Sequence, residues 1–158
     1  MNLPSRDELS ELVKAAGVKL RLRNTLRYVP EEITLPEVRD FLAITNKSGG
    51  EGILLYGDTI APFTLTPRVA KTGGRVAAII CDICATWRRG PESASITFRK
   101  GDKNTVTFLV CADLDCSLHV RDLTPVGVLS RSQIRETIIP EQRIERLNDR
   151  LTRILDCL

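Results

Sequence analysis

The sequence predicts an α+β protein, in which a small antiparallel sheet accompanies an N-terminal helix, a cysteine-rich segment and a long C-terminal amphipathic helix. Short apolar runs separated by turn residues indicate the sheet, and helical apolar spacing near both ends of the chain indicates the helices. The 158 residues, 42% hydrophobic and 27% charged, are enough for one ordinary domain or for one core with a small additional lobe.

The N-terminal helix is predicted over residues 6–16. Ser5 and Glu8 have the capping-box spacing, in which each side chain accepts a hydrogen bond from the other residue's backbone N–H. Apolar residues follow at helical spacing, and Gly17 ends the run. Alternating apolar and basic residues at 18–23 then predict a short strand or extended segment.

The sheet is predicted from apolar runs bounded by turn residues. Turn signals occupy residues 46–50 and 71–74, and the stretch between Pro30 and Pro36 has no regular pattern. A change in charge balance suggests an N-terminal α+β region over 1–74 and a second region over 75–158, or one continuous core. The predicted strands lie at 38–44, 51–56, 63–66 and 75–80.

Four of the five cysteines form two closely spaced pairs, Cys81-x2-Cys84 and Cys111-x4-Cys116. This spacing predicts a site of four thiolates for a structural zinc ion. The alternatives are a redox C-x-x-C motif, disulfides, or unrelated buried thiols. A redox motif would not need the second pair, and disulfides would suit a secreted chain. Since the N-terminus has no secretory pattern, we expect a cytoplasmic protein.

A hairpin is predicted between the two cysteine pairs, with strands at 94–99 and 105–110. Asp113 or Asp115 can then cap a helix that holds Cys116 in its first turn and continues through residues 117–121. A C-x2-C loop, a hairpin and two ligands at the start of a helix follow one another in a treble-clef zinc finger.

The positive charge of the chain is concentrated around the first cysteine pair and the hairpin. Residues 68–110 carry 8 basic and 3 acidic side chains, whereas 1–67 and 111–158 each have a net charge of −1. This charge distribution favours binding to an acidic surface of a partner protein or to an RNA backbone. The alternative is a soluble hairpin tipped with lysine and arginine, without a partner.

A long helix is predicted from Pro140 to the end of the chain, after a break at Pro125 and Gly127. Its apolar stripe is expected to pack on the chain's own sheet rather than on a partner. Cys157 lies off this pattern and is expected to be a bystander. The stripe comprises Ile144, Leu147, Leu151, Ile154, Leu155 and Leu158, and the polar face carries Arg143, Glu145, Arg146, Asp149, Arg150 and Arg153.

The segment 110–121, V-C-A-D-L-D-C-S-L-H-V-R, together with the C-x2-C pair before it and residues 139–147 after it, resembles the C-terminal zinc finger of the elongation factor G-binding family. That family includes the FusB-type fusidic acid resistance proteins, and its pattern is similar to C-x2-C, a hairpin, then C-A-D-x-x-C-S-L-x-V-R. The resemblance covers about 76–158. It implies that the zinc ligands are Cys81, Cys84, Cys111 and Cys116, and that His119 is not a ligand.

The resemblance also implies a function. We expect a non-catalytic, monomeric zinc protein that binds elongation factor G, the ribosome, or both, and that influences factor release and fusidic acid tolerance. Residues 1–70 do not resemble the helical N-terminal bundle of the resistance proteins. Trp87, with Arg88 and Arg89, is expected to form an interface anchor with a basic collar. Alternatively, Trp87 covers the small core around the zinc.

Two other functions are alternatives to binding elongation factor G. An RNA- or DNA-binding zinc module would place basic side chains on phosphates, although few aromatic residues are available for base stacking. A zinc enzyme is disfavoured because four cysteine ligands leave no open position for water. No apolar run approaches the length of a membrane helix. The basic side chains of the nucleic-acid alternative are Arg88, Arg89, Arg99, Lys100 and Lys103.

Overall fold

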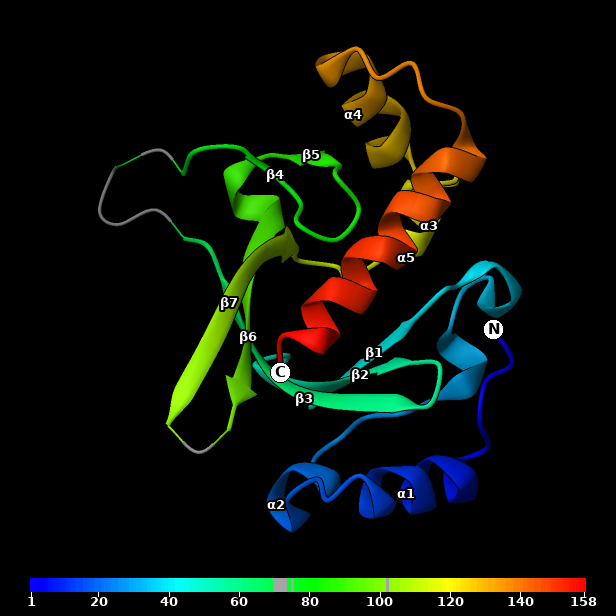
Figure 1. Cartoon of the computed structure of the whole chain (residues 1–158), viewed down its shortest axis with the longest axis vertical. Helices are drawn as coiled ribbons and strands as arrows, with labels where there is room; N and C mark the ends of the chain where they lie inside the picture. Colours follow the sequence, from blue (N-terminus) through cyan, green and yellow to red (C-terminus); the bar gives the residue numbers. More distant parts are fainter. Residues whose placement is uncertain (70–73, 75, 102) are drawn as a thin grey trace. The chain divides into compact units, whose positions relative to one another are not determined.

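The computed structural model describes residues 1–69, 74, 76–101 and 103–158 (Figure 1). The chain divides into two compact units, Met1–Leu65 and Thr66–Leu158. The boundary expected from the sequence, between 74 and 75, lies later in the chain than this division. The predicted turn at 71–74 and the first residue of the strand predicted at 75–80 fall largely outside the described residues.

The first unit begins with helix α1, Arg6–Ala15. The predicted capping box is confirmed, because Ser5 Oγ accepts a hydrogen bond from the Glu8 N–H and the Glu8 carboxylate accepts one from the Ser5 N–H. The helix ends before Gly17, whose φ of +68° favours glycine.

The extended segment predicted at 18–23 is wrong, because helix α2 occupies Leu20–Arg23. Leucine, lysine and arginine are good helix formers, and over so few residues an alternating pattern does not exclude one helical turn. Two 3₁₀ turns follow, η1 at Pro30–Glu32 and η2 at Pro36–Val38, each beginning with a proline.

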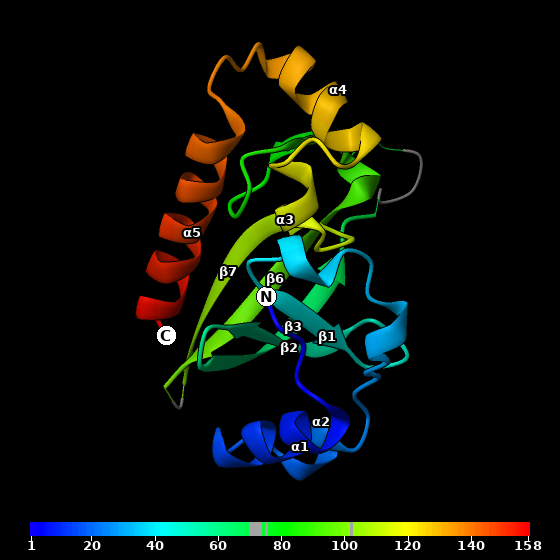
Figure 2. The same ribbon diagram turned by 90° about the vertical axis from the view of Figure 1, so that its right-hand side faces the viewer.

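The strands of the first unit form an antiparallel meander of β1, Leu42–Thr45, β2, Glu51–Tyr56, and β3, Thr59–Pro67. Asn46 builds the first turn, since its Oδ1 accepts a hydrogen bond from the Gly50 N–H. Figure 2 shows α1 and α2 together on one side of these strands. The core between them contains Leu9, Val13, Val18, Leu42, Ile44, Ile53 and Leu55.

The second unit begins with two short paired strands, β4, Ile79–Ile80, and β5, Trp87–Arg88, on either side of the first cysteine pair. After a 3₁₀ turn at Gly90–Glu92, the predicted hairpin is confirmed as β6, Ser93–Lys100, and β7, Asn104–Cys111. Helix α3, Cys116–His119, starts at the predicted place but does not continue to residue 121. Among the residues 76–80, only the last two are in a strand.

The break expected at Pro125 and Gly127 is wrong, because both residues belong to helix α4, Pro125–Ile134. Proline fits the first position of a helix, where its missing N–H would be unpaired anyway. Thr124 caps this helix by accepting a hydrogen bond from the Gly127 N–H.

The long C-terminal helix is confirmed as α5, Pro140–Asp156. Leu147 and Leu151 have no exposed surface, so the apolar stripe is covered within the chain. α3 contacts both α4 and α5, and Figure 2 shows α3 next to α4. Arg143, which was expected on the polar face, is only 2% exposed because its guanidinium pairs with Asp122. Along the described residues, no helix combines the length and apolarity needed to cross a bilayer.

Candidate metal centre

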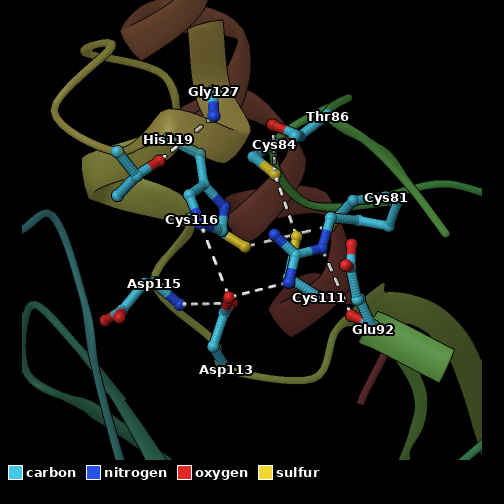
Figure 3. Close-up of polar contacts among 12 residues, drawn as sticks. Cys81, Cys84, Thr86, Glu92, Cys111, Asp113, Asp115, Cys116, His119 and Gly127 are labelled. Atoms are coloured by element: carbon cyan, nitrogen blue, oxygen red, sulfur yellow. Dashed lines mark hydrogen bonds and ion pairs between the residues drawn. The ribbon is translucent and has the colours of Figure 1, made fainter. Parts of the chain in front are cut away.

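Four cysteines from the two predicted pairs meet in the second unit (Figure 3). Cys81, Cys84, Cys111 and Cys116 are all at most 2% exposed, and their sulfurs lie within 4.8 Å of one another. Cys157, in contrast, is exposed and lies outside this cluster. The structure thus brings together the four residues that the spacing selected and leaves the fifth cysteine apart.

The sulfur separations fit a tetrahedral metal site. Cys81 Sγ lies 3.8 Å from Cys116 Sγ, and Cys84 Sγ lies 3.6 Å from Cys111 Sγ. Sulfurs about 2.3 Å from a tetrahedral zinc ion would be about 3.8 Å apart, whereas disulfide sulfurs are about 2.05 Å apart. The four cysteines therefore form a closed site for a structural zinc ion, which would hold the two pairs together.

The first pair lies on a tight backbone loop between β4 and β5. Cys81 N–H donates to the Thr86 carbonyl at 2.9 Å, and Ala85 N–H donates to the Cys81 carbonyl at 2.9 Å. Ala85 has a φ of +58°, in the left-handed region, which turns the chain sharply after Cys84. The Thr86 hydroxyl lies 3.0 Å from Cys84 Sγ. These contacts direct both sulfurs of the pair toward one point.

The second pair joins the end of a strand to the start of a helix. Cys111 ends β7, and Cys116 opens α3. Between them, Leu114 has a φ of +56° and donates its N–H to the Cys111 carbonyl at 3.2 Å. Asp115 is the N-cap residue of α3, but its side chain makes no capping hydrogen bond, and Asp113 Oδ1 accepts from the Asp115 N–H instead. The predicted place of the pair is thus confirmed, but the predicted side-chain cap is wrong.

The buried thiols influence one another's ionisation. Burial raises the pKa of Cys84, but hydrogen bonds with Cys111, Cys116, Cys81 and His119 outweigh this effect, and its pKa lies well below the usual range. Hydrogen bonds with Cys111, Cys81 and Cys84, together with burial, raise the pKa of Cys116 well above that range. Negative charge is thus favoured at Cys84 and opposed at Cys116. Metal binding must therefore release protons from the cluster.

His119 lies beside the four thiols without belonging to their cluster. Its side chain is buried, and its Nε2 lies 3.6 Å from Asp113 Oδ2. His119, Asp113 and Cys111 place possible ligand atoms within 4.8 Å of one another, but the four cysteines already complete a tetrahedron. Figure 3 shows His119 and Asp113 next to the cysteines.

The residues that were predicted to contact a partner lie in two different places of the second unit. Arg89 is exposed near the first cysteine pair, while Trp87 is partly buried and its backbone N–H donates to Ser130 Oγ at 2.7 Å. Arg88 differs from the prediction, since it is only 4% exposed and its Nη2 donates to Asp113 Oδ2 at 2.8 Å. A guanidinium buried in this ion pair is not a surface contact for a partner.

The remaining basic residues, Arg99, Lys100 and Lys103, are exposed at the tip of the β6–β7 hairpin. Strands of eight residues, rising about 3.3 Å per residue, place this tip roughly 23 Å from the Cys111 end of the hairpin. The tip and the surface around Arg89 are thus two separate basic regions of the second unit.

Several residues that support the site were not predicted from the sequence. Asp82 and Leu109 exchange two hydrogen bonds, which align the first cysteine loop with β7. Arg150 of α5 donates to the carbonyls of Cys81 and Asp82 at 3.2 and 3.3 Å. Because each contact joins segments distant in sequence, no local pattern could have revealed it.

A comparison with protein families agrees with this geometry. The family model of the FBP C-terminal treble-clef zinc finger matches residues 29–158. The chain belongs to this family. The match begins well before residue 76 and thus takes in β1–β3 of the first unit as well as the complete cysteine cluster. No curated protein and no solved structure matches the chain.

Proposed function

We propose that this protein is a non-catalytic zinc protein that binds elongation factor G, on or off the ribosome, through its second unit. The observation that carries the proposal is the family match over 29–158, together with the complete buried four-cysteine cluster inside it. The family relation supports binding of elongation factor G in general. The closed coordination of the zinc supports a role in shaping a surface rather than in catalysis.

The exposed basic side chains of the second unit are the proposed contact surface. One candidate is Arg89, beside the partly buried Trp87 and the zinc loop. The other is the hairpin tip with Arg99, Lys100 and Lys103. Since the hairpin tip lies roughly 23 Å along the strands from the Cys111 end of the hairpin, separate variants can show which of the two regions contacts the partner.

Binding is tested by affinity capture with the purified zinc-loaded protein, offering purified elongation factor G alone and then factor bound to ribosomes. Zinc content is measured on the same sample. We expect the factor to be retained by the zinc-loaded protein and lost after chelation. Failure to retain the factor in both settings, with zinc present, would argue against the proposal.

The contact surface is tested by charge reversal. Arg89→Glu and the triple variant Arg99→Glu/Lys100→Glu/Lys103→Glu are compared with Lys47→Glu, a control at an exposed lysine of the first unit. We expect one of the first two variants to weaken binding at least about tenfold, or ~1.4 kcal/mol, and the control to have no such effect. Equal binding by all three variants would remove both candidate regions from the interface.

The alternative is an RNA- or DNA-binding module, and the exposed basic tip of the hairpin favours it. Such a module would bind ribosomal RNA fragments in the absence of any protein, with affinity falling steeply as salt rises. The hairpin-tip variant should then lose RNA binding and reduce the salt slope. Retention of elongation factor G in RNA-free samples would instead support the first function.

A further inference from the structure

Arg88 and Asp113 join the two halves of the metal centre, although neither is a ligand. Arg88 lies four residues after Cys84, and Asp113 lies two residues after Cys111. The Arg88 Nη2 donates to Asp113 Oδ2 at 2.8 Å, and its Nε donates to the Glu92 carbonyl at 3.2 Å. The ion pair thus connects the segment after the first cysteine pair to the loop within the second.

Further hydrogen bonds fix the geometry of this connection. The Glu92 carbonyl also accepts from the Ala112 N–H at 3.0 Å, so Arg88 and the backbone after Cys111 share one acceptor. Asp113 Oδ1 accepts from the Asp115 N–H, which fixes the carboxylate within its own loop. The same carboxylate lies 3.6 Å from His119 Nε2. The Asp113 carboxylate therefore contacts three groups near the cysteine cluster: the Arg88 guanidinium, the Asp115 N–H and the His119 ring.

The Arg88–Asp113 ion pair is partly shielded from water, so removing one partner would affect the cysteine loops. The Arg88 side chain is 5% exposed and that of Asp113 is 37% exposed, so the contact is shielded on the arginine side. Among the described residues, Arg88 Nη1 has no hydrogen-bond partner and is buried. Without Asp113, the guanidinium would lose its counter-ion in this environment and would have to move, and the cysteine loops it connects would move with it.

We propose that Arg88 and Asp113 are positioning residues of the zinc site. Their ion pair holds the two cysteine pairs together in the zinc-bound finger, and its loss therefore weakens zinc retention. Four thiolates repel one another, so a contact outside the coordination sphere that joins the two halves of the folded site helps to keep its ligands together. This inference concerns the metal centre alone and does not depend on the proposed partner.

The test measures zinc affinity by competition with a chromogenic chelator, using the full-length protein. The variants are Asp113→Asn, Arg88→Gln and the double variant. We expect each single change to weaken zinc binding by about 10- to 100-fold. Because the two residues act through one contact, the double variant should be no weaker than either single variant. The cobalt-substituted protein should keep its thiolate charge-transfer bands, since all four ligands remain.

The matched control is Asp122→Asn. Asp122 also pairs with a buried arginine of the second unit, Arg143, but that pair joins the segment after α3 to α5 rather than the two cysteine pairs. We expect this variant to lower thermal stability and to weaken zinc binding less than Asp113→Asn does.

Two results would overturn the proposal: an Asp113→Asn protein that retains zinc within about threefold of the original, or an Asp122→Asn protein whose zinc binding is weakened as much as that of Asp113→Asn or more. If Arg88→Gln does not fold, Arg88→Lys is measured instead, because it keeps the charge but not the paired nitrogens. Its zinc affinity should then lie between those of the original protein and Asp113→Asn, and an affinity equal to the original would also contradict the proposal.

Discussion

Asp122 accepts two hydrogen bonds from the guanidinium of Arg143, at 2.9 and 2.7 Å. Asp122 follows α3, and Arg143 lies in the first turn of α5. Arg131 of α4 donates to the same carboxylate at 2.7 Å. One carboxylate therefore links the segment after α3 to both α4 and α5, and its two arginine partners are separated from it by 9 and 21 residues.

Asp122→Asn should destabilise the second unit by about 3 kcal/mol, because it leaves the buried Arg143 without its counter-ion. The measurement is the free energy of unfolding from urea titration. Glu32→Gln serves as the control, since Glu32 pairs with Arg27 at 2.8 Å but both side chains are more than half exposed. This control should change stability by less than about 1 kcal/mol. Similar losses in the two variants would contradict our account of the buried pair.

The same pair predicts how stability depends on pH. Hydrogen bonding to Arg143 lowers the pKa of Asp122 in the folded protein, and the charges of Arg143 and Arg131 act in the same direction. A carboxyl whose folded pKa is depressed contributes stability above its unfolded pKa of about 3.9. That contribution is lost as the pH falls through the folded value.

Acid titration of unfolding free energy checks this prediction. The original protein should lose more stability than Asp122→Asn as the pH falls below about 4, because the variant has no carboxyl to protonate at this position. Parallel curves for the two proteins would show that Asp122 does not contribute to acid sensitivity.

Removal of the metal should unfold the finger. A lobe this small buries little apolar area, so zinc binding supplies much of its folding free energy. We expect Cys111→Ser, or a strong chelator, to abolish the ordered structure of residues 76–122, seen as loss of hydrogen-exchange protection there. Cys157→Ser is the control, because this exposed thiol lies outside the cluster. A thermal melt that does not respond to chelator would contradict the prediction.

Gly52 should tolerate no side chain, whereas Gly50 in the preceding turn should. A Cβ at Gly52 would collide with the Ile44 carbonyl oxygen across the β1–β2 pair, while a Cβ at Gly50 would approach nothing closer than Ser48 Oγ at 3.8 Å. We expect Gly52→Ala to cost about 1–3 kcal/mol. Gly50→Ala should cost less than about 1 kcal/mol, and urea unfolding compares the two. Equal losses would show that the close approach at Gly52 is not the cause.

Local patterns predicted the parts of the fold whose contacts are local. Ser5 and Glu8 lie three residues apart and bond directly, so the start of α1 was evident from the sequence. The hairpin and α5 followed from alternation and helical periodicity over eight or more residues. The four cysteines could be assigned as zinc ligands because a structural zinc ion binds four ligands and the two closely spaced pairs supply four thiolates.

The features that were not predicted depend on contacts between residues that lie far apart in the sequence. Gly127 looked like a break, but a Cβ at this position would collide with the His119 carbonyl oxygen, so the glycine allows α4 to approach α3. Helical periodicity places Arg143 on the solvent-facing side of α5, but its pairing with Asp122 buries it. The burial of Arg88 likewise depends on Asp113, 25 residues later. Such pairings follow from tertiary structure and leave no periodic signal in the sequence.

The hydrogen bonds from Arg150 to the carbonyls of Cys81 and Asp82 have a consequence for the order of assembly during synthesis. The last cysteine ligand, Cys116, leaves the ribosomal exit tunnel well before Arg150 does. Arg150 can therefore donate to these carbonyls only after all four cysteines are available to bind metal. A nascent chain that ends shortly after α3 has all four cysteines but lacks Arg150, so the carbonyls of Cys81 and Asp82 lack the two hydrogen bonds that α5 supplies.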